Sequence, residues 1–268
     1  MGRHGVISID HAMAALGVGL TAAYRRVAAC IDGGLLERLE LQRHQPSLLR
    51  ATRRGLRYAG LDALPTARVS PGGVDHALRC ATVGRLLERR HGLSRVLTER
   101  EILAAERLAE EPIASARMCG PRRRRHARPP LHRPDFAVLS AGHPLTADRY
   151  PAAYDRTRRR GGGDPSDIPG AHQREVSEAE ALTRGRGISD DHGRRPAEAE
   201  DIRVVAVEVE LTPKSPGRLV AIMLAWYEAG WVSGVHYLCE PGPTRRAVER
   251  AVLKMQAGRK VAISEVPR

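Results

Sequence analysis

The stretch DIRVVAVEVELTPKS, residues 201–215, decides the fold of the second half of this chain. Its β-branched residues form a nearly continuous apolar run, which is typical of a strand buried at the centre of a sheet. Glu208 and Glu210 interrupt the run at alternate positions, so both carboxylates point to one face of the strand. Carboxylates are almost never fully buried unless they are paired or bind a cation. This face is therefore either open to water or the site of a metal ion.

A second apolar stretch, LHRPDFAVL at residues 131–139, predicts another strand and carries Asp135 near its start. Two strands of one sheet can bring Asp135, Glu208 and Glu210 together at one edge, and Lys214 follows just past the other strand. Carboxylates that lie so close repel one another unless a cation bridges them. Oxygen ligands suit Mg²⁺ or Mn²⁺, so these three acids are the predicted metal ligands. The alternative is an exposed sheet edge with solvated acids.

Composition points to a polyanionic partner. The 268 residues suffice for one or two domains, and the net charge of +13 favours nucleic acid. Only three of the 44 basic residues are Lys, so a GC-rich coding bias explains part of this charge. Aromatic residues make up 3%, which argues against a stacking platform for single strands. The four Cys form no C-x-x-C pair and no apolar run is long enough to span a membrane, so we expect a cytoplasmic protein without a zinc site.

The N-terminal region predicts a helix-turn-helix followed by a hairpin. Ser8 is a cap for a first helix, Gly17-Val18-Gly19 ends it, and Thr21 is the predicted cap of a second helix. LLERLELQ and SLLRATRRG then predict two strands joined by a turn at Gln45-Pro46, as in the wing of a winged helix.

The predicted DNA contacts come from the start of the second helix and from the end of the wing. The second helix would enter the major groove through its first turns, and the Arg residues after the wing would lie near phosphates. The alternative is an ordinary small helical domain with a solvated Arg-rich face. The candidate DNA-binding residues are Thr21, Tyr24, Arg25, Arg26, Arg53, Arg54 and Arg57.

Three further segments complete the organisation of the chain. Residues 72–92 predict a long amphipathic helix, a connector or a dimerisation element of a homodimer, in which His76 packs or caps rather than binds a metal. Thr98 and Glu101 have the spacing of a capping box at the start of another helix. Residues 148–201 have the composition of a disordered insertion. The second half alternates helices and strands, which predicts an α/β fold (α+β overall) with a mixed sheet.

The order of these elements, with RPD on one strand and VEVEL on the next, resembles the PD-(D/E)XK nuclease fold and its αβββαβ core. The resemblance implies that Asp135 and Glu208 bind Mg²⁺. Glu210 stands where the family has Lys, as in those restriction enzymes of this fold that use E-x-E, and Lys214 is a second source of positive charge. A glutamate on the first helix of such nucleases often faces the metal, a place that Glu99 or Glu101 would fill.

Together with the winged helix, the chain resembles the replication-relaxation family of actinobacterial plasmids and mobile elements. The resemblance implies a winged domain at residues 1–66, a connecting helix at 67–95 and a nuclease-like domain at 96–268. It also implies binding of double-stranded DNA in plasmid replication or its control. Two alternatives remain open: an active Mg²⁺-dependent endonuclease, and a winged-helix transcriptional regulator whose second domain is not catalytic.

Overall fold

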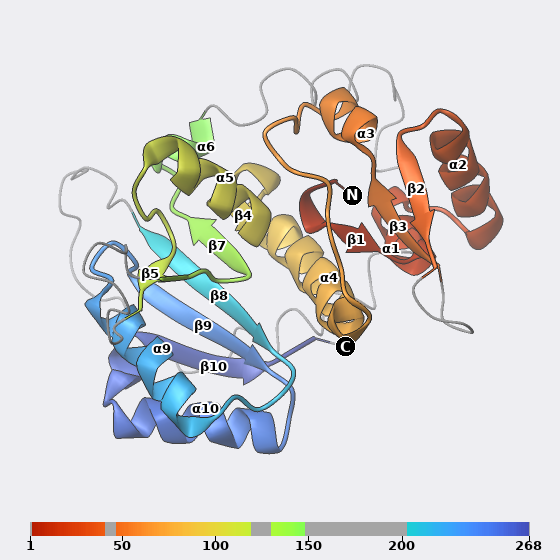
Figure 1. The fold of residues 1–268 in the computed structure, drawn as a ribbon. Helices are drawn as coiled ribbons and strands as arrows, with labels where there is room; N and C mark the ends of the chain where they lie inside the picture. Colours follow the sequence, from red (N-terminus) through yellow and green to blue (C-terminus); the bar gives the residue numbers. More distant parts are fainter. Residues whose placement is uncertain (1, 41–46, 119–129, 148–202, 268) are drawn as a thin grey trace, which may run out of the picture. The chain divides into compact units, whose positions relative to one another are not determined.

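Strand β8 (Val204–Glu210) lies at the centre of a five-stranded mixed sheet with the order β10-β9-β8-β7-β4 (Figure 1). The structure, a computed structural model, describes residues 2–40, 47–118, 130–147 and 203–267, which belong to one compact unit. Strand β8 runs antiparallel to β7 and parallel to β9, so the sheet is mixed, as predicted. The other strands of this sheet are β4 (Val96–Thr98), β7 (Phe136–Leu139), β9 (Gly234–Cys239) and β10 (Val261–Glu265).

The two faces of β8 pack against different helices. Val207 and Val209 pack with Val83 of helix α4, whereas Ala206 belongs to a second apolar cluster that includes Trp226 of helix α9. The period of two along the strand separates these two sets of side chains. The helices of this part of the chain are α4 (Val74–His91), α5 (Glu99–Ala109), α6 (Pro144–Ala147), α9 (Pro216–Glu228) and α10 (Pro243–Lys254), with short 3₁₀ turns η2 (Pro71–Gly73), η3 (Leu93–Arg95) and η5 (Ala257–Arg259).

The predicted strand over residues 131–139 is two strands. Leu131–His132 (β6) pairs with Ala116–Arg117 (β5) in a separate two-stranded sheet, and β7 begins only at Phe136. Asp135 therefore lies in the break between two strands rather than on one of them. Strand β4 was not predicted from the sequence. It has only three residues and leads directly into α5, so it is too short to show the alternation of apolar and polar residues that marks a strand.

The N-terminal part has a three-stranded sheet with the order β1-β3-β2, in which β2 and β3 form an antiparallel pair. Helices α1 and α2 are bent by 103° across the short break between them. The elements are η1 (Gly2–His4), β1 (Val6–Ile7), α1 (Ile9–Leu16), α2 (Leu20–Asp32), β2 (Leu36–Leu39), β3 (Leu48–Ala51) and α3 (Arg53–Tyr58). In the described part of the chain, no helix alone has the length and apolar composition of a membrane span; only the bent α1–α2 pair together meets that test.

Helix starts follow the predicted caps in two of three cases. Ser8 caps α1, and Thr98 with Glu101 forms a complete capping box on α5. Thr21 is not a cap, because α2 begins at Leu20 and Gly19 occupies the cap position without a side-chain hydrogen bond. The predicted Gln45-Pro46 turn and the whole of the predicted insertion at 148–201 lie outside the described residues.

Arg3, near the N-terminus, contacts helices α4 and α5, which belong to the larger part of the chain. Its guanidinium is buried and forms ion pairs with Glu88 of α4 at 2.7 Å and with Glu101 of α5 at 2.8 Å. Removing one partner of such a buried pair leaves an uncompensated charge, which costs about 3–5 kcal/mol. The Arg3 contacts therefore fix the positions of α4 and α5.

Gly55 gives a test of the packing of α3 against the segment before β2. A Cβ at residue 55 would lie 2.0 Å from the backbone oxygen of Leu35, which also accepts the Thr52 N–H at 3.0 Å and cannot move freely. We expect Gly55→Ala to lower the free energy of unfolding by about 2–4 kcal/mol in urea titrations. The matched control is Gly217→Ala in α9, where a Cβ meets no atom within 4 Å. Equal stability of the two variants would contradict this packing.

Candidate functional site

Asp135 joins three elements at the end of the sheet. Its backbone oxygen accepts the Glu99 N–H at the start of α5 at 2.8 Å, and its Oδ2 accepts the Val209 N–H of β8 at 2.7 Å. Its Oδ1 lies 3.0 Å from Nε2 of His76 on α4. The break before β7 allows these contacts, because Asp135 is free of strand pairing. One carboxylate thus connects the central strand to the helix that covers it.

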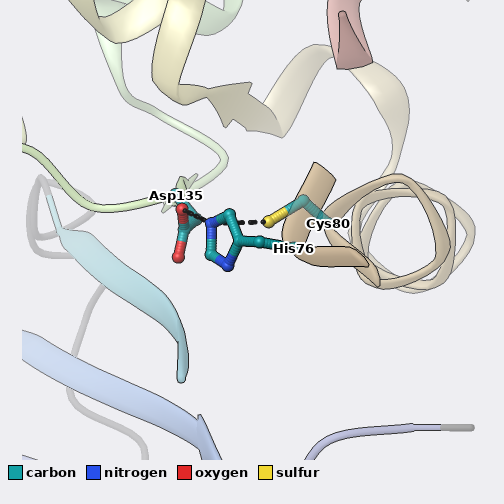
Figure 2. Close-up of side chains that lie close together, drawn as sticks. All are labelled: His76, Cys80 and Asp135. Carbon is teal, nitrogen blue, oxygen red and sulfur yellow. Dashed lines mark hydrogen bonds and ion pairs between the residues drawn. The ribbon is translucent and has the colours of Figure 1, made fainter. Parts of the chain in front are cut away.

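His76 and Cys80 stand one turn apart on α4 and face the same side, as Figure 2 shows. The Cys80 Sγ lies 3.4 Å from Nε2 of His76. Among the described residues, these two and Asp135 are the group of three potential metal ligands whose ligand atoms all lie within 4.8 Å of one another. The sequence predicted that His76 packs or caps rather than binds a metal, and the structure places its ring in contact with Asp135 and Cys80. The i, i+4 spacing with Cys80 was the signal in the sequence.

The surroundings of this cluster change the acidity of its members. The hydrogen bond to Asp135 raises the pKa of His76, so the imidazolium form is favoured. Burial raises the pKa of the Cys80 thiol, and the charge of Asp135 adds to that effect. Burial and the Asp135 charge also raise the pKa of Glu99. The site is therefore rich in acidic groups, and a cation would be stabilised there.

Glu208 and Glu210 are both only 5% exposed, on the β8 face that carries Ala206. Glu208 accepts a hydrogen bond from, or forms an ion pair with, Nε2 of His132 at 2.8 Å, and Glu210 is paired with Lys214. Burial raises the pKa of Glu208, although the His132 contact opposes the shift. The buried acids thus have internal partners, which was not among the predicted alternatives of water or metal.

The structure brings the predicted metal ligands to one end of the sheet without gathering all three. Phe136 of β7 pairs with Val207 of β8, so in this antiparallel register the next two residues to face each other are Asp135 and Glu208. The negative charge of Asp135 contributes to the raised pKa of Glu208. The carboxylate oxygens of Asp135, Glu208 and Glu210 do not form a group within 4.8 Å among the described side chains.

The two candidate helix glutamates differ in their surroundings. Glu101 accepts hydrogen bonds from Arg3 and from the Thr98 N–H, so it serves the helix start and the buried ion pair. The charges of Asp135, His76 and His132 all affect the pKa of Glu99. Glu99 is therefore the α5 glutamate that belongs to the site.

A groove of about 800 Å³ opens beside the cluster. His76, Cys80, Glu99 and Asp135 line it, together with four arginine side chains, Arg3, Arg68, Arg100 and Arg107. Arg100 also donates hydrogen bonds to the backbone oxygens of Gly2 and Pro65. The groove therefore combines a potential cation site with positive charge suited to an anion.

The predicted DNA-contacting residues are all exposed. On α2, Thr21, Arg25 and Arg26 are exposed, and Tyr24 is 48% exposed. After the hairpin, Arg54 and Arg57 are exposed as well. Arg53 is exposed too, and it also donates a hydrogen bond to the backbone oxygen of Leu64 at 2.9 Å. Its side chain thus has a structural contact of its own.

No known family model matches the chain, and comparisons with curated proteins and with solved structures gave no match either.

The His76–Asp135 pair predicts a pH dependence of stability. Because folding raises the pKa of His76 above 6.5, the stabilisation is complete just below pH 6.5 and is lost as the pH rises through the raised value. With EDTA present, wild type should therefore exceed His76→Ala in melting temperature most at about pH 5.5–6, with a smaller difference at higher pH.

His91 on the same helix provides the control. Burial lowers its pKa, so the difference between wild type and His91→Ala should change with pH in the opposite direction. A His76 difference that is independent of pH would show that the imidazole does not interact with an ionised Asp135.

Proposed function

We propose that this protein binds double-stranded DNA through its N-terminal part, as a winged helix-turn-helix. The observation that carries the proposal is the 103° bend between α1 and α2 across the break at residues 17–19, followed by the antiparallel β2–β3 hairpin. Helix-turn-helix units have crossing angles of about 90–120° and a turn of three or four residues. The second helix of such a unit reads the major groove through its N-terminal residues.

The charges of α2 support this orientation. The first turn of α2 has no acidic residue, and Arg25 and Arg26 are exposed one turn further along. Thr21 and Tyr24 add exposed polar and aromatic groups near the same end. Arginine contacts to phosphate release condensed counterions, which provides sequence-independent affinity. Such contacts also agree with the net charge of +13 of the chain.

The biological setting that we propose is plasmid or mobile-element replication or its control. This setting rests on the resemblance in sequence pattern to the replication-relaxation family and on the order of the two parts of the chain. Binding to an origin fragment in preference to unrelated DNA is its first requirement.

A gel-shift titration at several salt concentrations tests DNA binding. We expect Arg25→Ala and Arg26→Ala each to weaken binding to all duplexes and to reduce the salt slope by about one unit. Arg259→Ala, which removes an exposed arginine from η5, is the control and should leave both quantities unchanged. Unchanged affinity and salt slope in both α2 variants would contradict the proposal, provided that their melting temperatures match wild type.

Metal-dependent cleavage of DNA is the second candidate function. Apart from α5, β5 and β6 before β7 and the short helix α6 after it, the order α4-β4-β7-β8-α9-β9 corresponds to an αβββαβ core. Asp135 and Glu208 occupy neighbouring register positions, and Lys214 supplies an ammonium beside Glu210, where the nuclease pattern has its lysine. Mg²⁺ or Mn²⁺ at these acids would polarise a phosphoryl oxygen and generate the attacking hydroxide.

Nicking of supercoiled plasmid in the presence of Mn²⁺ tests cleavage. We expect the nicking rate to fall by about tenfold to a hundredfold in Glu208→Gln and in Lys214→Ala. Lys254→Ala, at the exposed end of α10, should retain the wild-type rate. Absence of nicking by wild type, or equal nicking by all variants, would leave DNA binding without cleavage as the function.

A further inference from the structure

We propose that His76, Cys80 and Asp135 form a binding site for a transition-metal ion of the zinc class. The three residues come from α4 and from the break before β7, and all three line the groove of about 800 Å³. The proposal does not rest on DNA binding or cleavage. It assigns to Asp135 a different set of partners from the all-oxygen site of a nuclease.

The distances between the ligand atoms suit one ion. His76 Nε2 lies 3.0 Å from Asp135 Oδ1 and 3.4 Å from Cys80 Sγ. In a tetrahedral zinc site the corresponding N···O and N···S separations would be about 3.4 Å and about 3.6 Å, given usual zinc–ligand bond lengths. The two measured distances are shorter by a few tenths of an ångström. Small side-chain adjustments therefore suffice to admit the ion.

The contacts favour a metal site over a nucleophilic Cys–His–Asp triad. In a triad the two ring nitrogens have separate tasks, one toward the nucleophile and one toward the acid. Here the same nitrogen, Nε2 of His76, makes both contacts, as Figure 2 shows. Three potential ligand atoms within 4.8 Å of one another are the arrangement that one ion needs.

The ligand types select the class of ion. Thiolate and imidazole prefer zinc and similar transition metals, whereas Mg²⁺ prefers oxygen ligands. The second carboxylate oxygen of Asp135 accepts the Val209 N–H at 2.7 Å, which fixes the orientation of this ligand. Such an outer contact is usual around metal ligands. We therefore expect zinc and cobalt to bind much more tightly than magnesium.

The site would keep a position open for a further ligand. Three protein ligands with a fourth, exchangeable position are typical of zinc sites that act on a bound molecule. The His76 side chain is 45% exposed and that of Asp135 is 16% exposed, so solvent reaches the cluster. Arg68 and Arg107 are exposed along the same groove. An anionic oxygen, such as that of a phosphate group, is the ligand that this charge distribution favours.

Cobalt titration of the full chain under reducing conditions tests the proposal. We expect Co²⁺ to give a thiolate-to-cobalt charge-transfer band that saturates at one ion per chain and that Zn²⁺, but not Mg²⁺, abolishes. Cys80→Ser should lose the band. Cys30→Ser, which removes a partly buried thiol from α2, is the matched control and should retain it.

His76→Ala provides a second variant that does not depend on the packing of Cys80. Because this side chain is 45% exposed, we expect the variant to remain folded, with the pH-dependent loss of melting temperature described above, and to bind Co²⁺ at least about tenfold more weakly. A band that persists in Cys80→Ser, or that disappears in Cys30→Ser, would overturn the proposal. Wild-type affinity in His76→Ala, displacement by equimolar Mg²⁺, or no binding of Co²⁺ by wild type would overturn it equally. The arginine variants of α2 should bind cobalt normally, so failure here is distinct from failure of DNA binding.

Discussion

The Asp135 carboxylate is the contact on which the arrangement of the larger sheet and its covering helices depends. Its side chain accepts the Val209 N–H of β8 and contacts His76 of α4, and its backbone oxygen accepts the Glu99 N–H of α5. A carboxylate that accepts backbone N–H groups is fixed in position at little cost, because both partners are already ordered. The same residue is therefore well placed to hold a ligand, since its orientation does not have to be established on binding.

Strand β8 serves two chemically different environments. Its Val207 and Val209 pack toward α4, near the His76–Cys80–Asp135 cluster, whereas Glu208 and Glu210 lie buried with His132 and Lys214 as partners. Burial of a carboxylate disfavours its charge unless a partner compensates, and both acids have one. A zinc-class ion at the His76–Cys80–Asp135 cluster and Mg²⁺ or Mn²⁺ at Asp135, Glu208 and Glu210 are thus two separate hypotheses, and both use Asp135 as a ligand. The groove with its arginines lies on the side of the first.

Much of the fold follows from local patterns, but the site depends on contacts between distant residues. Apolar periodicity predicted α4, and the buried run predicted β8 as a central strand. The alternate positions of Glu208 and Glu210 correctly placed them on one face, yet nothing local indicates that His132 is a partner, 76 residues away. Likewise, His76 and Cys80 share a helix face by spacing alone, whereas Asp135 joins them across 59 residues through the break between β6 and β7. The prediction of Thr21 as a helix cap was wrong because α2 already begins at Leu20. Thr21 therefore lies inside the helix, where its side chain cannot act as the cap.

A crystal structure of the protein grown with Zn²⁺, with anomalous data collected on both sides of the zinc absorption edge, tests the central claim most directly. We predict one strong anomalous peak bonded to His76 Nε2, Cys80 Sγ and Asp135 Oδ1 at about 2.0–2.3 Å, with a non-protein ligand facing the groove. A peak held by Asp135 and Glu208 without the sulfur would contradict this claim. So would a structure at saturating Zn²⁺ in which His76 still contacts Asp135 directly and no peak lies between them.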